Sequence, residues 1–364
     1  MIASYTNPLS NTFLDIASKI QIQSNFCIIH PDSQPFSLPS LMAETLEQSS
    51  TALQDKYLTL LLRNFLYGIY YNNSLPSIFA ANISNPNLLL HQDLENNSVF
   101  EIDWQFYNQL HEHNHGKGYL DSGWRVLRQE PDGSLAVTKD GLTLHVEESY
   151  LEPEAYNSKV DDLIAIRLPK NRLNNGFYLA IGNSGKKQQH DLQNTWDDSD
   201  IISIFFNLNP AGAIALMDSL TSILNAAEIS FKFQVPHHPL SCDRHDSGIL
   251  NFQRQDYPVI QELLKEIYAE NQAYFQPETP LFTKFLAPGL SLAEQPIEKP
   301  LNKQSFGVNR CQIIANALFE AWEKSIDSPE EKANIIRQHF DRKSIDLERP
   351  YLNPNSEDIY QLMG

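Results

Sequence analysis

The sequence predicts an α+β fold in which a mainly antiparallel sheet is flanked by helices, with a helical N-terminal portion. Three observations support this prediction. Apolar residues recur at helical spacing near both ends of the chain. The middle of the chain holds several short segments with the composition of strands. Turn residues separate these segments at the short spacing of antiparallel hairpins.

The first part of the chain, residues 11–70, is predicted to be helical. Its apolar residues include Leu14, Ile16 and Ile20, and the dense run Leu58, Leu60, Leu61, Leu62, Phe65, Leu66 and Ile69. Residues 72–97 are rich in Asn, Ser and Pro, which favour turns, so we expect a linker or a long ordered loop there. We therefore divide the chain into a helical N-terminal domain, residues 1–110, and an α+β domain, residues 111–364.

The middle of the chain is predicted to contain a hairpin and further strands. Residues 135–138 and 142–146 are apolar runs on either side of an Asp-Gly pair, the strongest short-range signal for a hairpin. Further strands are expected at residues 163–168, 177–182 and 201–208. Asn209 and Pro210 then supply an N-cap and a proline at the first helical position, so a helix that covers one face of the sheet should follow.

Another strand is predicted at residues 229–235, where apolar and polar side chains alternate. Such a strand has one apolar face and one polar face, and the polar face carries Lys232. Residues 249–252 are its expected partner across a loop. Helices are expected again in the C-terminal third, at residues 256–274 and 308–324 and from Ser328 onward.

The charge of the chain excludes two classes of partner. Lys and Arg number 27 against 45 Asp and Glu, a formal net charge of -18. The field of such a chain opposes binding to nucleic acid or to an anionic lipid surface, so we expect neither nucleic acid nor a membrane as a partner. No segment approaches the roughly 18 apolar residues that span a bilayer, and the N-terminus lacks the pattern of a secretory signal.

The three cysteines, Cys27, Cys242 and Cys311, lie far apart in the sequence and form no C-x-x-C pair. An odd number of scattered cysteines argues against a disulfide framework and against a zinc site built from cysteines. A reducing compartment fits this pattern best, so we expect a cytoplasmic protein.

Familiar catalytic motifs are missing from the sequence. It contains no Walker A loop, G-x-G-x-x-G, G-x-S-x-G or H-E-x-x-H, which excludes the best-marked classes of nucleotide-binding protein and hydrolase. His111, His113 and His115 alternate, and in a strand all three could face one side and bind a metal. Their segment is rich in Asn and Gly, however, which favours an exposed loop. We therefore expect no metal.

The densest mixture of titratable side chains follows the strand that carries Lys232. It comprises His237, His238, Cys242, Asp243, Arg244, His245 and Asp246. One interpretation is the polar tip of a surface hairpin, and the other is a functional site. The sequence leaves both interpretations open.

Five cations occupy positions from which a scaffold could direct them inward. They are Lys139, Arg167, Lys232, Arg244 and Arg310, and each is expected on a strand, at a strand end or at the start of a helix. If they converge, they form an electropositive pocket for a phosphate, because guanidinium groups bind oxyanions in bidentate fashion. A desolvated lysine among other cations can also act as a base, because its pKa falls. Taken singly, each is more often a solvated charge.

Several blocks between residues 116 and 360 occur in the order seen in a known family. The blocks include Gly123-Trp124-Arg125-Val126, Lys139-Asp140-Gly141-Leu142, Phe231-Lys232, Arg244-His245-Asp246, Ser305-Phe306-Gly307-Val308-Asn309-Arg310 and Pro350-Tyr351-Leu352-Asn353-Pro354. With these blocks the chain resembles the HopA-type type III effector family. Bacterial homologues of these effectors include stand-alone proteins encoded beside peptide natural-product genes.

The resemblance implies a phosphoserine or phosphothreonine lyase, as in relatives from class V lanthipeptide pathways. There, a kinase phosphorylates Ser or Thr of a precursor peptide, and the lyase expels phosphate to leave a dehydroamino acid. A phosphorylated precursor peptide and a kinase are therefore the expected partners. Elimination needs a base for the α-proton, cations for the departing phosphate and an acid. We expect the reaction to use neither a metal nor an organic cofactor.

The matching blocks carry over Lys139, Lys232, Arg244, Asp246 and Arg310 as site residues. Within the reaction that the resemblance implies, we expect the base to be Lys232 or Lys139. The expected phosphate ligands are Arg167, Arg244 and Arg310. His245 or His238 is the expected acid that protonates the leaving group.

Two blocks also have a purely structural interpretation. Two prolines bracket Tyr351 and predict a rigid turn that docks this side chain on the core. Residues 286–294 contain Pro288 and Gly289 and are expected to form a turn, which could also edge a cleft. Neither block is expected to supply a catalytic group.

Two departures from the family pattern keep other functions open. Ser203 stands where we expect a basic residue on its strand, and the loop at residues 236–247 is rich in histidine. One alternative is a non-catalytic protein that binds a kinase or a precursor peptide, which is favoured if the cations lie far apart. The other is an effector-like protein that acts on a host target, which a secretion-chaperone site near the N-terminus would favour.

Overall fold

The computed structural model describes residues 8–23, 25–38, 40–80, 100–151, 155–174, 176–185, 200–297 and 304–363. The strands of its main sheet are β8 (Asn171–Asn174), β9 (Phe177–Ile181), β10 (Ile201–Phe206), β11 (Phe231–Pro236), β12 (Gly248–Gln253), β13 (Lys284–Ala287) and β14 (Leu290–Glu294). They lie in the order β13-β14-β10-β12-β11-β9-β8, and every neighbouring pair is antiparallel. The predicted α+β class is confirmed, because helices at both ends of the chain accompany antiparallel sheets.

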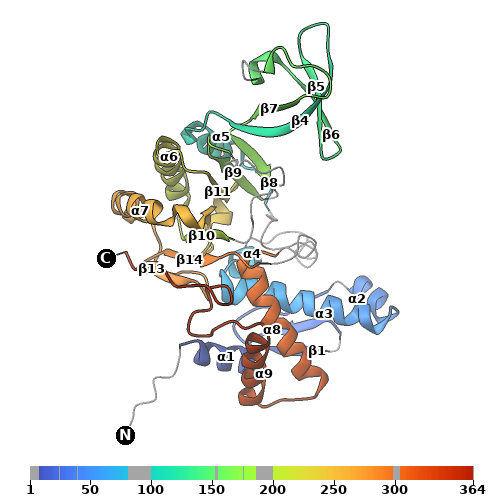
Figure 1. Ribbon diagram of the computed structural model, residues 1–364. Helices are drawn as coiled ribbons and strands as arrows, with labels where there is room; N and C mark the ends of the chain where they lie inside the picture. Colours follow the sequence, from blue (N-terminus) through green and yellow to red (C-terminus); the bar gives the residue numbers. More distant parts are fainter. Residues whose placement is uncertain are drawn as a thin grey trace.

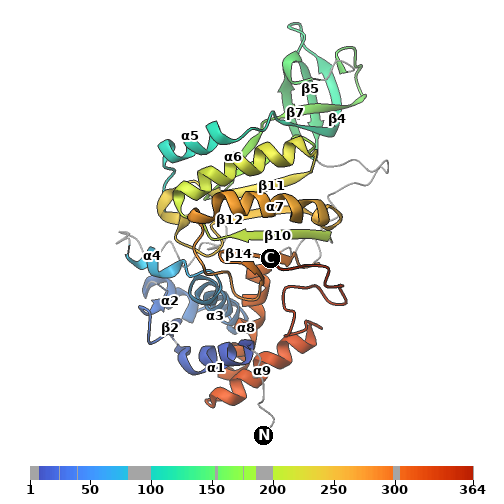
Figure 2. The ribbon, with the colours of Figure 1, turned by 90° about the vertical axis from the view of Figure 1, so that its left-hand side faces the viewer.

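Two helices cover one face of the seven-stranded sheet (Figures 1 and 2). They are α6 (Pro210–Ala226) and α7 (Tyr257–Asn271). The side chain of Asn209 caps α6 by accepting a hydrogen bond from the backbone of Gly212, and Pro210 opens the helix, as predicted. Phe206 of β10 packs against Phe233 of β11 on this face. The apolar side of the predicted alternating strand therefore lies under the helices.

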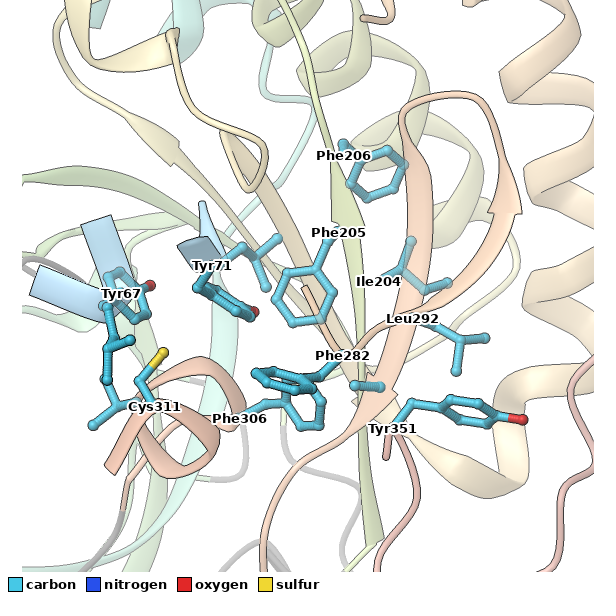
Figure 3. Close-up of a cluster of buried hydrophobic side chains, with 14 of the residues drawn as sticks. Tyr67, Tyr71, Ile204, Phe205, Phe206, Phe282, Leu292, Phe306, Cys311 and Tyr351 are labelled. Carbon is cyan, nitrogen blue, oxygen red and sulfur yellow. The ribbon is translucent and has the colours of Figure 1, made fainter. Parts of the chain in front are cut away.

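The opposite face of the sheet is reached by η1 (Tyr67–Tyr71), a π-helical turn, and by α8 (Phe306–Glu323). Phe205 of β10 contacts Tyr71 and Phe306 at ring-centroid distances of 6.5 and 6.3 Å. Figure 3 shows these aromatic side chains gathered around Phe205, with Cys311 of α8 beside them. Every residue of β10 is buried, because helices pack on both of its faces.

The N-terminal helices share one hydrophobic core with the C-terminal helices and the sheet. They are α1 (Pro8–Lys19), α2 (Ser40–Glu47), α3 (Thr51–Leu66), α4 (Leu75–Ala80) and α5 (Trp104–His113). Here α3 packs on α8, and α1 packs on α9 (Pro329–Arg342), as Figure 2 shows. The side chain of Ser328 caps α9, in line with the predicted start of that helix. The expected division after residue 110 falls inside α5.

A second sheet has four strands in the order β6-β5-β4-β7. It lies at the end of the molecule opposite α1 and α9 (Figure 1). Its strands are β4 (Tyr119–Gln129), β5 (Leu135–Lys139), β6 (Leu142–Val146) and β7 (Leu163–Leu168), and η3 (Glu148–Tyr150) follows β6. Trp124, Val137 and Ile166 belong to a small core of its own. The predicted hairpin is confirmed, because Asp140 and Gly141 turn with positive φ between β5 and β6.

Two local expectations were wrong, and a third was confirmed only in part. Residues 11–70 are not wholly helical, because β1 (Gln21–Gln23), β2 (Cys27–Ile29) and β3 (Phe36–Ser37) form a small sheet there. His111 and His113 lie on α5 rather than in a loop, because Asp103 caps that helix. The segment at residues 286–294 is more than a turn, because Gly289 with positive φ joins β13 to β14.

The remaining helical turns are short. They are η6 (Pro239–Cys242), η7 (Arg254–Asp256) and η8 (Gln272–Tyr274). Of the expected linker at residues 72–97, the structure describes the part that contains α4, and the rest lies outside the described residues. Among the described helices, none has the length and apolar character needed to cross a membrane.

Candidate functional site

A row of polar side chains crosses the middle of the seven-stranded sheet. Ser203 of β10 pairs with Asn251 of β12, and Asn251 pairs with Lys232 of β11. Because side chains alternate along a strand, these three lie on the same face as Phe205, opposite α6 and α7. Ser203 is fully buried, whereas Asn251 and Lys232 are half-buried. Together with Gln295, which follows β14, they are called the polar row below.

Hydrogen bonds connect the polar row to the first residue of α8. The backbone N–H of Phe306 donates to Oε1 of Gln295 at 3.2 Å, and Nε2 of Gln295 donates to Oγ of Ser203 at 2.5 Å. Oγ of Ser203 in turn donates to Oδ1 of Asn251 at 2.5 Å. Buried polar groups on central strands require such partners, since an unpaired one costs about 1–3 kcal/mol.

Lys232 lies on the less covered face of its strand. Phe231, Phe233 and Val235 are buried on the side of α6 and α7, whereas Lys232 and Gln234 are half-buried on the other side. The predicted division of this strand into an apolar and a polar face is therefore confirmed. Lys232 is therefore partly accessible on this side of the sheet.

Arg244 and Asp246 bind each other in a buried pair. Nε and Nη2 of Arg244 donate to the two carboxylate oxygens of Asp246 at 2.5 and 2.9 Å. Asp246 also accepts hydrogen bonds from Tyr67 and Asn72, each at 3.1 Å. The guanidinium group lies 5.4 Å from the ring centre of Phe177 on β9. The pair thus ties η1 and the residue after it to the loop that precedes β12.

Arg310 is buried inside the C-terminal part of the fold. Its Nε and Nη2 donate to the carbonyl oxygens of Pro350 and Leu352 at 3.0 and 3.1 Å, and Nη1 donates to Asn309. These bonds hold the turn that contains Tyr351, and the side chain of Tyr351 is buried as predicted. The observed contacts of Arg310 are those of a residue that stabilises this turn.

Lys139 and Arg167 lie in the four-stranded sheet, on β5 and β7. Nζ of Lys139 binds Asp121 at 2.7 Å and the backbone carbonyl of Ser122 at 2.6 Å, and it lies over the ring of Trp124. Two of the five cations thus belong to a different sheet from Lys232.

The expected cations therefore occupy three places rather than one cluster. Pro236 follows Lys232 by four residues and pairs with Phe177, over which Arg244 lies. Four residues of a strand span about 13 Å, so Lys232 and Arg244 share a face but meet only if both side chains extend toward each other. Arg310 lies on α8 and is directed toward the C-terminal turn. Lys232 is the cation that the polar row contains.

The histidines near this face are held mostly in the neutral form. Burial lowers the pKa of His237, His238 and His245, as removal from water disfavours the charged imidazolium. Nδ1 of His237 is buried without a hydrogen-bond partner in the described part of the chain. His238 stacks on Phe100 and accepts a hydrogen bond from the backbone of Leu240. His237 is buried and His238 and His245 are half-buried, so the segment is only partly an exposed hairpin tip.

The described residues hold no group of three or more His, Cys, Asp or Glu side chains arranged to bind a metal. The three alternating histidines have separate partners. His111 bonds to Tyr178, His113 to the carbonyl of Gln109, and His115 to Asp218 at 2.8 Å. The helix that contains His111 and His113 therefore does not place the three on one side.

A cavity of about 200 Å³ lies at the start of β10, beneath the C-terminal segment. Asp200, Arg254, Glu294, Asn353 and Ser356 contribute its polar lining. The carboxylate of Glu294 accepts hydrogen bonds from the backbone of Asn353, from Ser356 and from Tyr360. Residues of the C-terminal segment thus occupy the acceptors that face this cavity.

Asn251 and Gln295 were not among the site residues predicted from the sequence. Ser203 was singled out only as a departure from a basic pattern. The signal that could have found them is the interruption of an apolar central strand, Ile-Ile-Ser-Ile-Phe-Phe, by one polar residue. Such a residue needs partners on the adjacent strands, because a buried hydroxyl is rarely left unpaired.

Comparison with known proteins identifies relatives of this chain. The HopA1 effector protein family matches residues 168–352. A solved effector protein from Pseudomonas syringae pv. tomato strain DC3000 is 18% identical, covers 71% of this chain and 86% of its own, and has a TM-score of 0.39. Another, from Pseudomonas syringae pv. syringae strain 61, is 14% identical, with coverages of 82% and 98% and a TM-score of 0.40. A search of curated proteins found no match.

Proposed function

The chain belongs to the HopA1 effector protein family, and we propose that it is an effector-like protein that binds a segment of another protein at the polar row. The observation that carries this proposal is the placement of Lys232 and Asn251, which are paired and half-buried on two neighbouring central strands of the sheet. Amide and amine groups in such a place suit the carbonyl groups and charged side chains of a peptide.

The finer activity that we propose for the same face is β-elimination of phosphate from phosphoserine or phosphothreonine in a peptide. In this reaction the uncharged amine of Lys232 takes the α-proton, and the electron pair of the Cα–H bond moves onto the adjacent carbonyl oxygen as an enolate. The enolate then forms the Cα=Cβ double bond as the Cβ–Oγ bond breaks, and phosphate leaves with the electrons of that bond. The ammonium group formed on Lys232 returns its proton to water or to the departing phosphate. The products are a dehydroamino acid and phosphate.

The family resemblance supports the elimination reaction, and so does the place of Lys232 beside Asn251 on a half-buried face of the sheet. Arg167, Arg244 and Arg310 remain predicted phosphate ligands, and Lys139, Asp246, His238 and His245 remain predicted site residues. A kinase that phosphorylates the peptide and a precursor peptide remain the predicted partners within peptide natural-product biosynthesis.

One observation favours a protein that binds without catalysis. Asp246 holds Arg244, backbone carbonyls hold Arg310, and Asp121 holds Lys139. Side chains engaged in this way must leave their partners before they can bind a phosphate, which costs free energy. The second candidate function is therefore that of a non-catalytic partner for a kinase, a precursor peptide or a host protein.

A single incubation separates these functions. The purified chain is mixed with phosphothreonine and phosphoserine peptides, including those encoded near its gene, with and without a chelator. Peptide mass reports elimination, and fluorescence anisotropy reports binding. Loss of phosphoric acid, leaving a product that a thiol traps, supports the lyase. Saturable binding without a change in mass supports the non-catalytic partner. If the chain neither binds any peptide nor changes its mass, both candidate functions are contradicted.

A further inference from the structure

The backbone N–H of Phe306, at one end of the polar row, fixes which groups donate and which accept hydrogen bonds along the row. A backbone N–H can only donate, so the atom of Gln295 that faces Phe306 must be its carbonyl oxygen. The amide nitrogen of Gln295 then faces Ser203 and donates to the hydroxyl. The hydroxyl of Ser203 donates its own hydrogen bond to the side-chain oxygen of Asn251. The orientation of the Asn251 amide therefore follows from chemistry along the row.

This orientation leaves Nδ2 of Asn251 as a donor. Its oxygen faces Ser203 on β10, so its nitrogen lies on the side of the amide away from β10, where β11 carries Lys232. Among the residues that the structure describes, no acceptor is bonded to this nitrogen. Directly paired residues of neighbouring strands have Cβ atoms about 5 Å apart. An N–H donor of fixed direction thus lies beside the lysine.

We infer that Nδ2 of Asn251 donates a hydrogen bond to the carbonyl oxygen of the residue that loses its α-proton, and that Ser203 and Gln295 are positioning residues for this donor. The inference rests on the elimination proposed above. When a base removes the α-proton, negative charge moves onto the oxygen of the adjacent carbonyl. A donor already held in place stabilises that charge without reorganising as the reaction proceeds. The α-hydrogen and carbonyl oxygen of one residue are close enough for neighbouring side chains to reach both.

Lys232 on β11 and Asn251 on β12 then have different roles in the reaction. Lys232 handles the proton, Asn251 handles the charge that the proton leaves behind, and Ser203 and Gln295 prevent the amide from turning over. This arrangement also explains why a fully buried hydroxyl stands in the apolar strand β10. An alanine there would avoid the burial of a polar group, but Asn251 would then be free to rotate.

The test measures kcat and KM for phosphopeptide elimination by Asn251→Ala and Asn251→Asp. Both variants lack the donor, and Asn251→Ala adds no charge beside Lys232. We expect kcat to fall by about 10²–10³-fold while KM changes little, because the bond strengthens as charge develops. Asn316→Asp on α8 is the matched control, since it is exposed and makes the same change in charge far from the row.

A double-mutant cycle tests the positioning role. Ser203→Ala should lower kcat in the wild-type background but have little further effect in Asn251→Ala, because the hydroxyl acts through the amide. Thermal unfolding of each variant shows whether it has folded. If the wild type eliminates phosphate and the kcat of Asn251→Ala lies within twofold of the wild-type kcat, the inference is overturned but the lyase activity is not. A rise in KM alone overturns it as well, because the contact is then one of binding. Absence of elimination by the wild type overturns the lyase and the inference together.

Discussion

The ion pair between Arg244 and Asp246 shows how single residues hold distant parts of this chain together. Asp246 is wholly buried and accepts hydrogen bonds from Tyr67 and Asn72 as well as from Arg244. A buried pair of this kind is costly to assemble, but removal of one member leaves a charge without a partner. The pair therefore matters for stability whether or not Arg244 also binds a ligand.

The first prediction concerns this pair. Asp246→Ala should lower the free energy of unfolding by about 3–5 kcal/mol, because the guanidinium of Arg244 stays buried without its carboxylate. Urea unfolding followed by circular dichroism measures the change. Asp341→Ala on α9 is the control, because this side chain is exposed and should change the free energy by less than about 0.5 kcal/mol. An equal unfolding midpoint for Asp246→Ala and the wild type would contradict the role given to the pair.

The second prediction concerns pH. Burial lowers the pKa of His237 in the folded chain below its usual value near 6.5. The unfolded chain therefore takes up a proton first, and the contribution of this residue to stability is present above about pH 6.5 and is lost as pH falls below it. The free energy of unfolding should decline between pH 7.5 and 5, and it should decline less in His237→Gln. A variant with the same pH dependence as the wild type rules out His237 as a source of this decline.

At the scale of elements, η1 and α8 approach each other so closely that only glycine fits at the contact. A Cβ atom on Gly307 would overlap the ring of Tyr71 and press on that of Tyr67. The two tyrosines stack with ring centroids 4.9 Å apart, and Tyr71 also meets Phe205 of the sheet. Gly307 thus allows η1 to pack closely against α8. Figure 3 shows Tyr71 of η1 beside Phe205 of β10.

The third prediction follows from this contact. Gly307→Ala should destabilise the fold by about 1–3 kcal/mol through overpacking, although alanine is the better helix former by about 1 kcal/mol. Asn316→Ala, on the exposed side of the same helix, should be neutral or slightly stabilising. Thermal unfolding compares the two variants with the wild type. A higher melting temperature for Gly307→Ala would show that the contact has room for a methyl group.

Elements marked by local chemistry could be predicted from the sequence, and elements made by distant contacts could not. Asn209 with Pro210 and the Asp-Gly pair at residues 140 and 141 specify their structures through backbone geometry and capping. The strands β1, β2 and β3 are only two or three residues long and form by pairing with one another, which no local pattern announces. In the candidate site, Lys232 could be found from alternation, whereas Asn251 and Gln295 required the order of the strands.

At the scale of the whole molecule, the chain builds two hydrophobic cores. The larger core joins the N-terminal helices, the seven-stranded sheet and the C-terminal helices, and the smaller one lies within the four-stranded sheet. The matched family region begins at residue 168, where β7 ends, so the four-stranded sheet precedes it. Lys139 and Arg167 belong to the smaller unit, and Lys232, Arg244 and Arg310 belong to the larger one.

Removal of the four-stranded sheet from the chain should leave the larger hydrophobic core intact. Tyr119 and Leu168 are paired residues at the base of the four-stranded sheet, so a Gly-Ser linker can join them in place of residues 120–167. The shortened chain should unfold cooperatively, because its remaining core is intact, and its activity shows whether the Lys232 face acts without Lys139 and Arg167. Calorimetry and the phosphopeptide assay measure the two properties. A folded but inactive chain would place Lys139 or Arg167 in the function.

Lys232 and its neighbours on the sheet face opposite α6 and α7 are proposed to act on a peptide, and one comparison of variants decides whether they do. Elimination from phosphothreonine and phosphoserine peptides is measured by mass for the wild type, for Lys232→Met and for Lys265→Met, an exposed position on α7. We predict that the wild type and Lys265→Met release phosphoric acid, and that Lys232→Met folds and binds the peptide but leaves its mass unchanged. Equal turnover in Lys232→Met would contradict the claim and make Lys139 the remaining predicted base.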